Sequence, residues 1–387
     1  MKLQSTAEEE IRQLIREHGR ITFAQFMHTC LYSPRGGFYA SGTQAIGSHF
    51  GTSPTSHPVF GALIARQLEQ MWHLLGEPAV FHAIEVGAGD GSLARSIVHA
   101  TRQLTTGFAR ALCYVAADYQ PRWPRVSDGR IGRDDQDAAA TSGAYQPVHQ
   151  VKTAGLHAFR NLVGCVLSNE LIDNFPVHRF AIQDGRVKEV FVTVDGGNLV
   201  ELLDEPSSAR IEERLAGLGL SLADGYRGEV NLAVEDWTNE AARALERGYV
   251  LTIDYGERGT DLYSPANSAG TLVCYHRHAA RKDPYEHIGE QDITCHVDFT
   301  TLMRLGERNG LTTLGYVSQR EFLTNLGFAA FLGALEAQGL SEARETLSRM
   351  AMTALVDPEE YGDLKVLAQA KGMGSSVALR GFAARTT

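Results

Sequence analysis

Short apolar runs alternate with longer amphipathic segments through the middle of the chain. The runs at 82–86, 112–117, 164–168 and 249–254 have the length and apolar content of buried strands. After the first run, Leu93, Ile97 and Val98 recur at helical spacing. Strands that alternate with helices usually pair in parallel, so the pattern predicts an α/β fold with a mostly parallel, Rossmann-like sheet.

A second pattern interrupts this core. The stretch HRFAIQDGRVKEVFVTVDGGNLVEL alternates apolar and polar residues around Asp184-Gly185 and Gly196-Gly197, which predicts a β-meander with primed two-residue turns. Further on, VDFTTLMRLGERNGLTTLGYVS predicts a helix that ends at Asn309-Gly310 and then a strand.

These patterns divide the chain into segments. Amphipathic helices are expected in the first 19 residues, at 21–31 and at 59–75. The segments are interpreted as a helical lid at 1–76, a sheet core at 77–180 and 246–320, an inserted subdomain at 181–245, and a helical segment at 321–387 whose helices run from 320 to about 370. Residues 124–144 are polar and poorly periodic, so a mobile loop is expected there.

Composition narrows the class of protein without assigning a function. The 387 residues are 43% hydrophobic and 21% charged, as in ordinary globular proteins, and their net charge is -10. This charge disfavours nucleic acid and anionic membranes as partners. The five cysteines are scattered without zinc-type spacing, and neither a signal peptide nor a membrane-spanning run is visible. We therefore expect reduced thiols, no disulfide and a cytoplasmic protein.

The glycine-rich stretch HAIEVGAGDGSLARSIV, residues 82–98, points to a ligand. Its spacing, Glu85 followed by Gly87, Ala88, Gly89 and Gly91, is E-x-G-x-G-x-G and not the dinucleotide fingerprint G-x-G-x-x-G. Bare glycine amides permit close backbone approach, and an acid before them suits a zwitterionic amino acid tail. S-adenosylmethionine has such a tail. A plain tight turn is the alternative.

Further polar residues follow the other predicted strands. Asp118, with Tyr119 after it, ends the next strand, where a carboxylate can grip both ribose hydroxyls. In SNELIDNFPVHRF, the side chains of Asn169, Glu170 and Asp173 follow a strand and could bind a cationic nitrogen; a helix cap with solvated acids is the alternative. Asp254 ends a further strand in the same way.

A histidine-rich stretch, CYHRHAARKDPYEHIGEQDITCHVDF, contains His276, His278, His287 and His296. Their spacings are irregular, and no pair lies on a confidently predicted helix. We therefore expect no metal site, and a loop whose side chains contact substrate or bond locally.

The motifs together resemble the MidA-like (DUF185) class I methyltransferases, a family that includes a mitochondrial complex I assembly protein arginine methyltransferase. The resemblance spans nearly the whole chain, in the order ITFAQFMHTCLYSPRGGFYASG, SHFGTSPTSHPVFG, IEVGAGDGSLA, SNELIDNFPVHRF, YVLTIDYG, GEQDITCHVDFTTL and EEYGDLKVLAQAKG. It implies a seven-stranded sheet with an antiparallel strand at 312–317. It also implies that Thr52, Ser53 and Pro54 cover the cofactor, although His49 and Thr55 replace acids of the family there.

The resemblance implies methyl transfer to protein arginine, with a respiratory complex I subunit as a possible protein substrate. Glu170 is the expected guanidinium clamp, assisted by Asp173 or Asp254. Two alternatives stay open. One is an O- or N-methyltransferase acting on a small molecule or peptide, where His296 or His178 would serve as a base for oxygen. The other is a non-catalytic assembly factor. A monomer and a homodimer are both compatible with the sequence.

Overall fold

The computed structural model describes residues 6–40, 51–119, 148–153, 155–277, 279–374 and 377–383. It divides into two compact units. We call residues 52–169, 240–253 and 311–387 the core unit, and residues 1–51, 170–239 and 254–310 the accessory unit. Two of the points at which the chain passes between the units are Asn169/Glu170 and Ile253/Asp254. The residues predicted at 124–144 to form a loop, and His49 and His278, lie outside the described residues.

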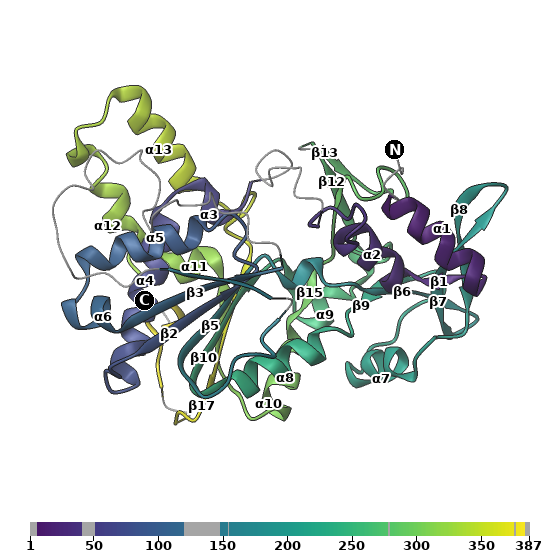
Figure 1. Ribbon diagram of the computed structural model, residues 1–387, viewed down its shortest axis with the longest axis horizontal. Coiled ribbons are helices and arrows are strands. Elements are labelled where there is room, and N and C mark those ends of the chain that lie inside the picture. The colour runs from purple at the N-terminus through teal and green to yellow at the C-terminus, as the bar shows by residue number, and fades with distance from the viewer. Residues whose placement is uncertain are drawn as a thin grey trace. The chain divides into compact units, whose positions relative to one another are not determined.

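A seven-stranded sheet forms the centre of the core unit (Figure 1), in the order β16-β17-β10-β5-β2-β3-β4. Its strands are β2 (Phe81–Val86), β3 (Leu112–Asp118), β4 (His149–Lys152), β5 (Leu162–Asn169), β10 (Leu245–Asp254), β16 (Thr312–Ser318) and β17 (Lys365–Lys371). The five strands from β10 to β4 pair in parallel, whereas β16 pairs antiparallel with β17. The predicted fold class is confirmed.

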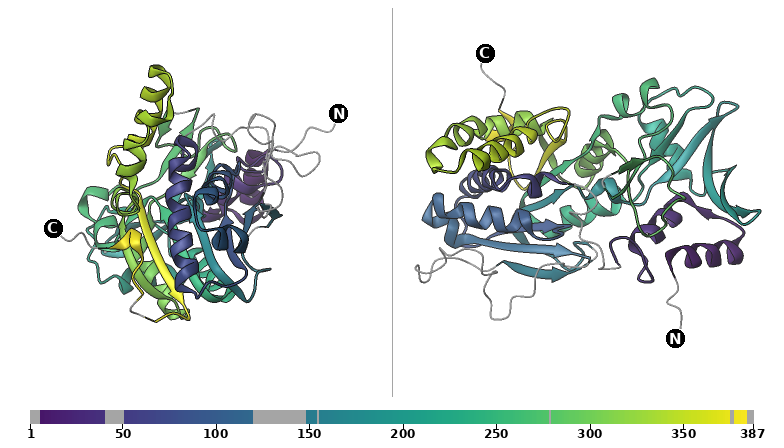
Figure 2. Two further views of the ribbon diagram at one scale, coloured as in Figure 1. Left: turned by 90° about the vertical axis from the view of Figure 1, so that its left-hand side faces the viewer. Right: turned by 90° about the horizontal axis from the view of Figure 1, so that it is seen from above.

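Helices cover this sheet. They are α3 (Ser53–Ser56), α4 (Val59–Leu74), α5 (Ser92–Ala100), α6 (Thr106–Ala111), α11 (Gln319–Asn325), α12 (Phe328–Gly333) and α13 (Glu342–Ala354), while α8 (Val234–Ala244) leads into β10. The long helix α4 runs along the sheet (Figure 2, left) and packs beside α5. A Cβ at Gly61 would lie 2.4 Å from Ser96 Cβ, so glycine permits this close approach.

A five-stranded antiparallel sheet organises the accessory unit. It consists of β1 (Ile21–Thr22), β6 (His178–Gln183), β7 (Arg186–Asp195), β8 (Asn198–Asp204) and β9 (Arg227–Val230). Both predicted turns are present, because φ is positive at both residues of Asp184-Gly185 and of Gly196-Gly197. That is the conformation a primed hairpin turn requires, and the β-meander is confirmed.

The first two helices, α1 (Ala7–His18) and α2 (Phe23–Tyr32), pack within the accessory unit (Figure 2, right). Their apolar residues Ile11 and Phe26 share one buried cluster with Val192, Cys274 and Ile293. The other helices of this unit are α7 (Ala209–Gly217), α9 (Gly259–Leu262) and α10 (Phe299–Arg308). Its smaller strands are β11 (Gly256–Glu257), β12 (Val273–His276), β13 (Ala279–Arg281), β14 (Asp292–Thr294) and β15 (Val297–Asp298). The 3-10 helices of the chain are η2 (Thr101–Gln103), η3 (Ile172–Asn174), η4 (Pro265–Asn267), η5 (Glu336–Gln338) and η6 (Arg380–Phe382).

The structure corrects the predicted segment boundaries. Residues 1–76 are not one lid segment, because α1 and α2 belong to the accessory unit and α4 to the core unit. Residues 254–310, predicted as core, pack with the inserted strands instead. Boundaries of this kind depend on long-range contacts that local periodicity does not report.

The C-terminal segment is not wholly helical. Strand β17 lies inside the central sheet between β10 and β16, where helix was expected to about residue 370. Its sequence, KVLAQAK, is short and has four apolar residues, a pattern that does not distinguish a buried strand from a helix. Among the described residues, no helix is long and apolar enough to cross a membrane.

Candidate functional site

The glycine loop of the core unit joins β2 to α5 through three left-handed residues. Gly87, Gly89 and Gly91 have φ of +77°, +53° and +75°. The backbone N–H groups of Gly87 and Ala88 donate to the carbonyl oxygen of Ala117 at 2.9 and 3.2 Å, which holds the turn against β3. Since L side chains disfavour positive φ, the backbone here requires glycine at these positions.

Asp118 and the glycine loop are joined directly. The amide N–H of Gly89 donates to Asp118 Oδ2 at 2.8 Å. Parallel pairing of β2 with β3 brings the carboxyl ends of both strands to one edge of the sheet. Two parts of the predicted cofactor site, 29 residues apart in sequence, are thus adjacent.

Glu85 is buried, with 4% of its surface exposed, and accepts a 2.8 Å hydrogen bond from the hydroxyl of Tyr114. Burial raises the pKa of Glu85 to about 8; the negative charges of Asp118 and Asp90 add to this, and the bond from Tyr114 opposes it. The unliganded carboxyl is therefore largely protonated at neutral pH. A ligand cation beside it would restore its charge.

The predicted cover over the cofactor, Thr52 to Pro54, begins the short helix α3. The side chain of Ser53 is fully buried, and its hydroxyl lies 3.1 Å from Nε2 of the equally buried Gln319. Gln319 also donates to the carbonyl oxygen of Leu355 at 3.0 Å. The hydroxyl of Ser53 thus anchors α3 to α11. Cofactor contacts by Thr52, Pro54 and Tyr119 stay predictions.

In the accessory unit, Asp254 binds the backbone of the N-E-L-I-D motif, residues 169–173. Its Oδ2 accepts the backbone N–H groups of Leu171 at 3.2 Å and Ile172 at 2.8 Å, and its Oδ1 accepts that of Tyr255 at 2.9 Å. The side chain is fully buried. Burial raises its pKa, and these donors offset part of the increase. Asp254 therefore holds the backbone around η3 in place.

Two further buried carboxyl groups lie with it. Asp292 Oδ1 accepts the hydroxyl of Tyr39 and the amide of Asn174, both at 2.9 Å. Burial raises the pKa of Asp292 to about 6. The pKa of Asp173 is raised well above its ordinary value, first by burial and then by the charges of Asp254 and Asp292. Among the residues that the structure describes, Asp173 Oδ1 has no hydrogen-bond partner.

Asn169 and Glu170 lie in the chain between the glycine-loop residues of the core unit and the buried carboxyl residues of the accessory unit. Asn169 is the last residue of β5, and Glu170 is the first residue of the accessory unit. Glu170 is partly exposed and has φ of +49°, a left-handed conformation that is costly for a non-glycine residue. Residues in this conformation occur in tight turns, as at Asp184, and also cluster at functional sites.

Sequence reasoning missed several residues of these clusters. Tyr114 lies inside a predicted strand, and Tyr39 and Asn174 lie inside stretches that carry the family resemblance, but no sequence pattern assigns a role to these three side chains. Asp292 lies in the histidine-rich stretch, where the sequence assigns it no role. Parallel pairing of β2 with β3, which places Tyr114 opposite Ala83, could have suggested that its hydroxyl reaches Glu85.

The histidines fall into different surroundings. His178 Nδ1 lies 2.7 Å from the buried carboxylate of Glu189, so this predicted base is already paired. His296 lines a small pocket with Arg214, Tyr263 and Asp298. His276 and His287 lie together, as described below, although their sequence spacing had argued against a shared site.

Comparison with known proteins assigns the family. A family model described as "Putative S-adenosyl-L-methionine-dependent methyltransferase" matches residues 63–317. The chain belongs to this family. The methyltransferase is 29% identical to a COG1565 superfamily member from Burkholderia thailandensis whose crystal structure contains S-adenosyl-homocysteine. The TM-score is 0.82, with 98% of this chain and 95% of that chain covered.

Curated relatives agree with this assignment. The methyltransferase is 28% identical to the mitochondrial protein arginine methyltransferase NDUFAF7 homolog of Drosophila melanogaster, over 94% of this chain and 85% of the relative. It is 25% identical to the mitochondrial protein arginine methyltransferase NDUFAF7 of Homo sapiens, over 79% and 69%. The resemblance noted in the sequence is confirmed, and the protein is an S-adenosylmethionine-dependent methyltransferase.

Proposed function

We propose that this methyltransferase transfers the methyl group to a guanidinium nitrogen of a protein arginine. The observation that carries the proposal is the buried group of Asp173, Asp254 and Asp292 in the accessory unit. The names of its relatives, protein arginine methyltransferases, agree with such an acceptor. A respiratory complex I subunit, suggested by the family resemblance, is a candidate substrate. The cytoplasmic location stays a prediction.

Buried carboxyl groups favour a cationic acceptor for an electrostatic reason. Burial and mutual repulsion hold the pKa of Asp173 high, so its charged form is costly without a cation. A guanidinium is always protonated and donates in a planar fork that matches carboxylates. A guanidinium beside these carboxyl groups would lower their pKa values. It would also donate a hydrogen bond to Asp173 Oδ1, which has no partner among the described residues.

On the cofactor side, Glu85 and Asp118 would hold the amino acid tail and the ribose, with the left-handed glycines permitting close approach of the backbone. When bound, the cofactor supplies a methyl group on a positively charged sulfur. The chain's residues must position the acceptor nitrogen and localise its positive charge elsewhere in the guanidinium. Glu170 is proposed as the clamp, with Asp173 or Asp254 assisting.

The proposed reaction balances simply. A nitrogen–carbon bond forms as the carbon–sulfur bond breaks, and its electron pair stays on sulfur. The nitrogen then gives up one proton, for which an ionised carboxylate of the buried group is the proposed first acceptor. His178, already bonded to Glu189, is not needed in this scheme.

The test is methyl transfer in a protein extract. The purified protein is incubated with methyl-labelled cofactor and extract from cells that lack it, and peptides are analysed by mass spectrometry. Label on arginine, as one or two transferred methyl groups per side chain, supports the proposal. Label confined to other residues or to small molecules would refute it. The Glu170→Gln variant, which removes the charge of the proposed clamp, is assayed in the same way. Glu213→Gln, at an exposed position of α7, is its matched control.

A further inference from the structure

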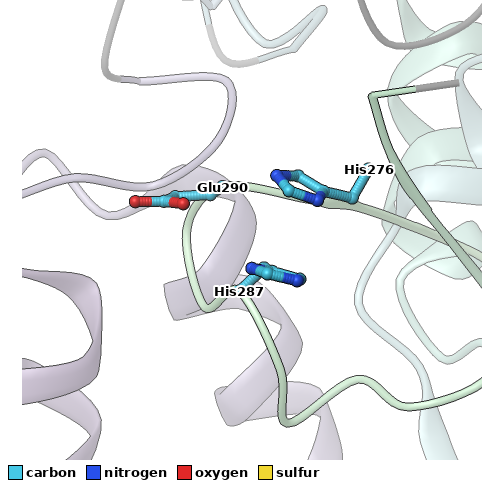
Figure 3. Close-up of side chains that lie close together, drawn as sticks. All are labelled: His276, His287 and Glu290. Atoms are coloured by element: carbon cyan, nitrogen blue, oxygen red, sulfur yellow. The ribbon is translucent and has the colours of Figure 1, made fainter. Parts of the chain in front are cut away.

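A second cluster of metal-ligating side chains lies outside the residues assigned to methyl transfer. His276 is the last residue of β12, and His287 and Glu290 lie in the turn that precedes β14. Figure 3 shows the two imidazole rings one above the other and the Glu290 carboxylate beside them. The ring centroids are 4.0 Å apart, and one donor atom from each of the three residues lies within 4.8 Å of the others.

We propose that His276, His287 and Glu290 bind a zinc ion. Two imidazole nitrogens and one carboxylate oxygen form a known zinc ligand set, with water in the fourth position. Zinc bonds of about 2.1 Å in a tetrahedron place donor atoms about 3.4 Å apart. The separation between donor atoms, at present up to 4.8 Å, must therefore shrink by as much as roughly 1.4 Å when zinc binds. His287 and Glu290 are exposed and can make this movement, whereas His276 is 9% exposed and fixes the site.

The backbone of the turn supports this arrangement. Glu290 N donates to the carbonyl oxygen of His287 at 2.8 Å, and φ of His287 is +46°. Gly289 approaches Gly36 so closely that a Cβ on it would lie 2.2 Å from the Gly36 carbonyl oxygen. The buried side chain of Gln291 donates to the carbonyl oxygen of Glu286 at 2.7 Å. These contacts fix the backbone of the turn, from which the side chains of His287 and Glu290 both lie close to His276.

Zinc at this site would join two segments of the accessory unit. It would tie the end of β12 to the turn before β14, and β14 begins with Asp292. Because Tyr275 pairs with Asp292, His276 is the next residue along β12 from that pair. The bound ion would therefore stiffen the segment that supplies Asp292 to the buried carboxyl group. The zinc site itself does not depend on the identity of the methyl acceptor.

Equilibrium zinc binding to tag-free protein tests the inference, with Co²⁺ absorption as a second readout of tetrahedral nitrogen and oxygen ligation. Wild type is expected to bind one Zn²⁺ per chain with a Kd of about 10 µM or tighter. His287→Ala is expected to raise the Kd by about 100-fold, and Glu290→Gln by about tenfold. His73→Ala is the matched control, because His73 is an exposed histidine beside a glutamate in the core unit and should leave the Kd unchanged.

Thiols are the competing ligands. Four of the five cysteines are buried and Cys113 is partly exposed, so Cys113→Ser is measured in parallel and is expected to bind zinc as wild type does. Zinc binding lost in Cys113→Ser, binding that survives His287→Ala, or no binding by wild type at about 0.1 mM Zn²⁺ would each overturn the inference.

Discussion

The protonation of Glu85 gives a quantitative prediction about cofactor binding. With the pKa of the unliganded carboxyl raised to about 8 by burial, most molecules carry a proton on Glu85 below that pH. If Glu85 meets the ammonium of the cofactor, binding favours the carboxylate and releases this proton. The affinity should then rise about tenfold per pH unit below pH 8. From pH 5.5 to 7.0, below the titration of the cofactor's amino group, the gain is about 30-fold, or about 2 kcal/mol.

Titration calorimetry across this pH range measures both the affinity and, through buffers of different ionisation enthalpy, the protons released. Glu85→Gln should bind with an affinity independent of pH. Tyr114→Phe removes the bond that lowers the pKa of Glu85, so its affinity should keep rising to higher pH than that of wild type. Equal pH dependence in wild type and Glu85→Gln would refute the reasoning.

The same group affects the stability of the unliganded protein. The folded pKa of Glu85 lies above its ordinary 4.5, so its contribution to stability is fully present below about pH 4.5 and is lost as pH rises through 8. The unfolding free energy of wild type should therefore fall relative to that of Glu85→Gln between pH 5 and 8, by at most about 4 kcal/mol. Denaturant unfolding at several pH values checks the sign.

Three further predictions concern single residues. Gly89→Val should abolish cofactor binding, because a β-branched residue is strained at φ of +53° and the bond to Asp118 depends on that backbone; calorimetry and circular dichroism separate lost binding from lost folding. Glu170→Gln should reduce turnover by about 100-fold and spare cofactor affinity, and an unchanged rate would exclude Glu170 as the clamp. Gln319→Ala should destabilise the protein by about 1–3 kcal/mol in denaturant unfolding, since it removes the buried hydrogen bonds that Gln319 donates to the Ser53 hydroxyl and to the carbonyl oxygen of Leu355; no change would contradict this account of α3.

Local sequence patterns were sufficient for much of the central sheet and for the glycine loop. The apolar runs located β2, β3, β5 and β10 to within a few residues, because a buried strand must be apolar over its whole length. The glycine loop could be recognised in the sequence because left-handed backbone favours glycine. The carboxyl end of β3 likewise placed Asp118 beside that loop.

The sequence by itself determined the fold class, the glycine loop and the family, since each depends on residues close together in the chain or on motifs in a fixed order. Only the tertiary structure decided which segments pack into each unit, that β17 enters the central sheet, and that Tyr39, Asn174 and Asp292 meet. It also brought His276 to His287, against the expectation from their spacing. The physical reason is that burial and pairing between distant segments fix these contacts, and they set the pKa of groups such as Glu85 and Asp173.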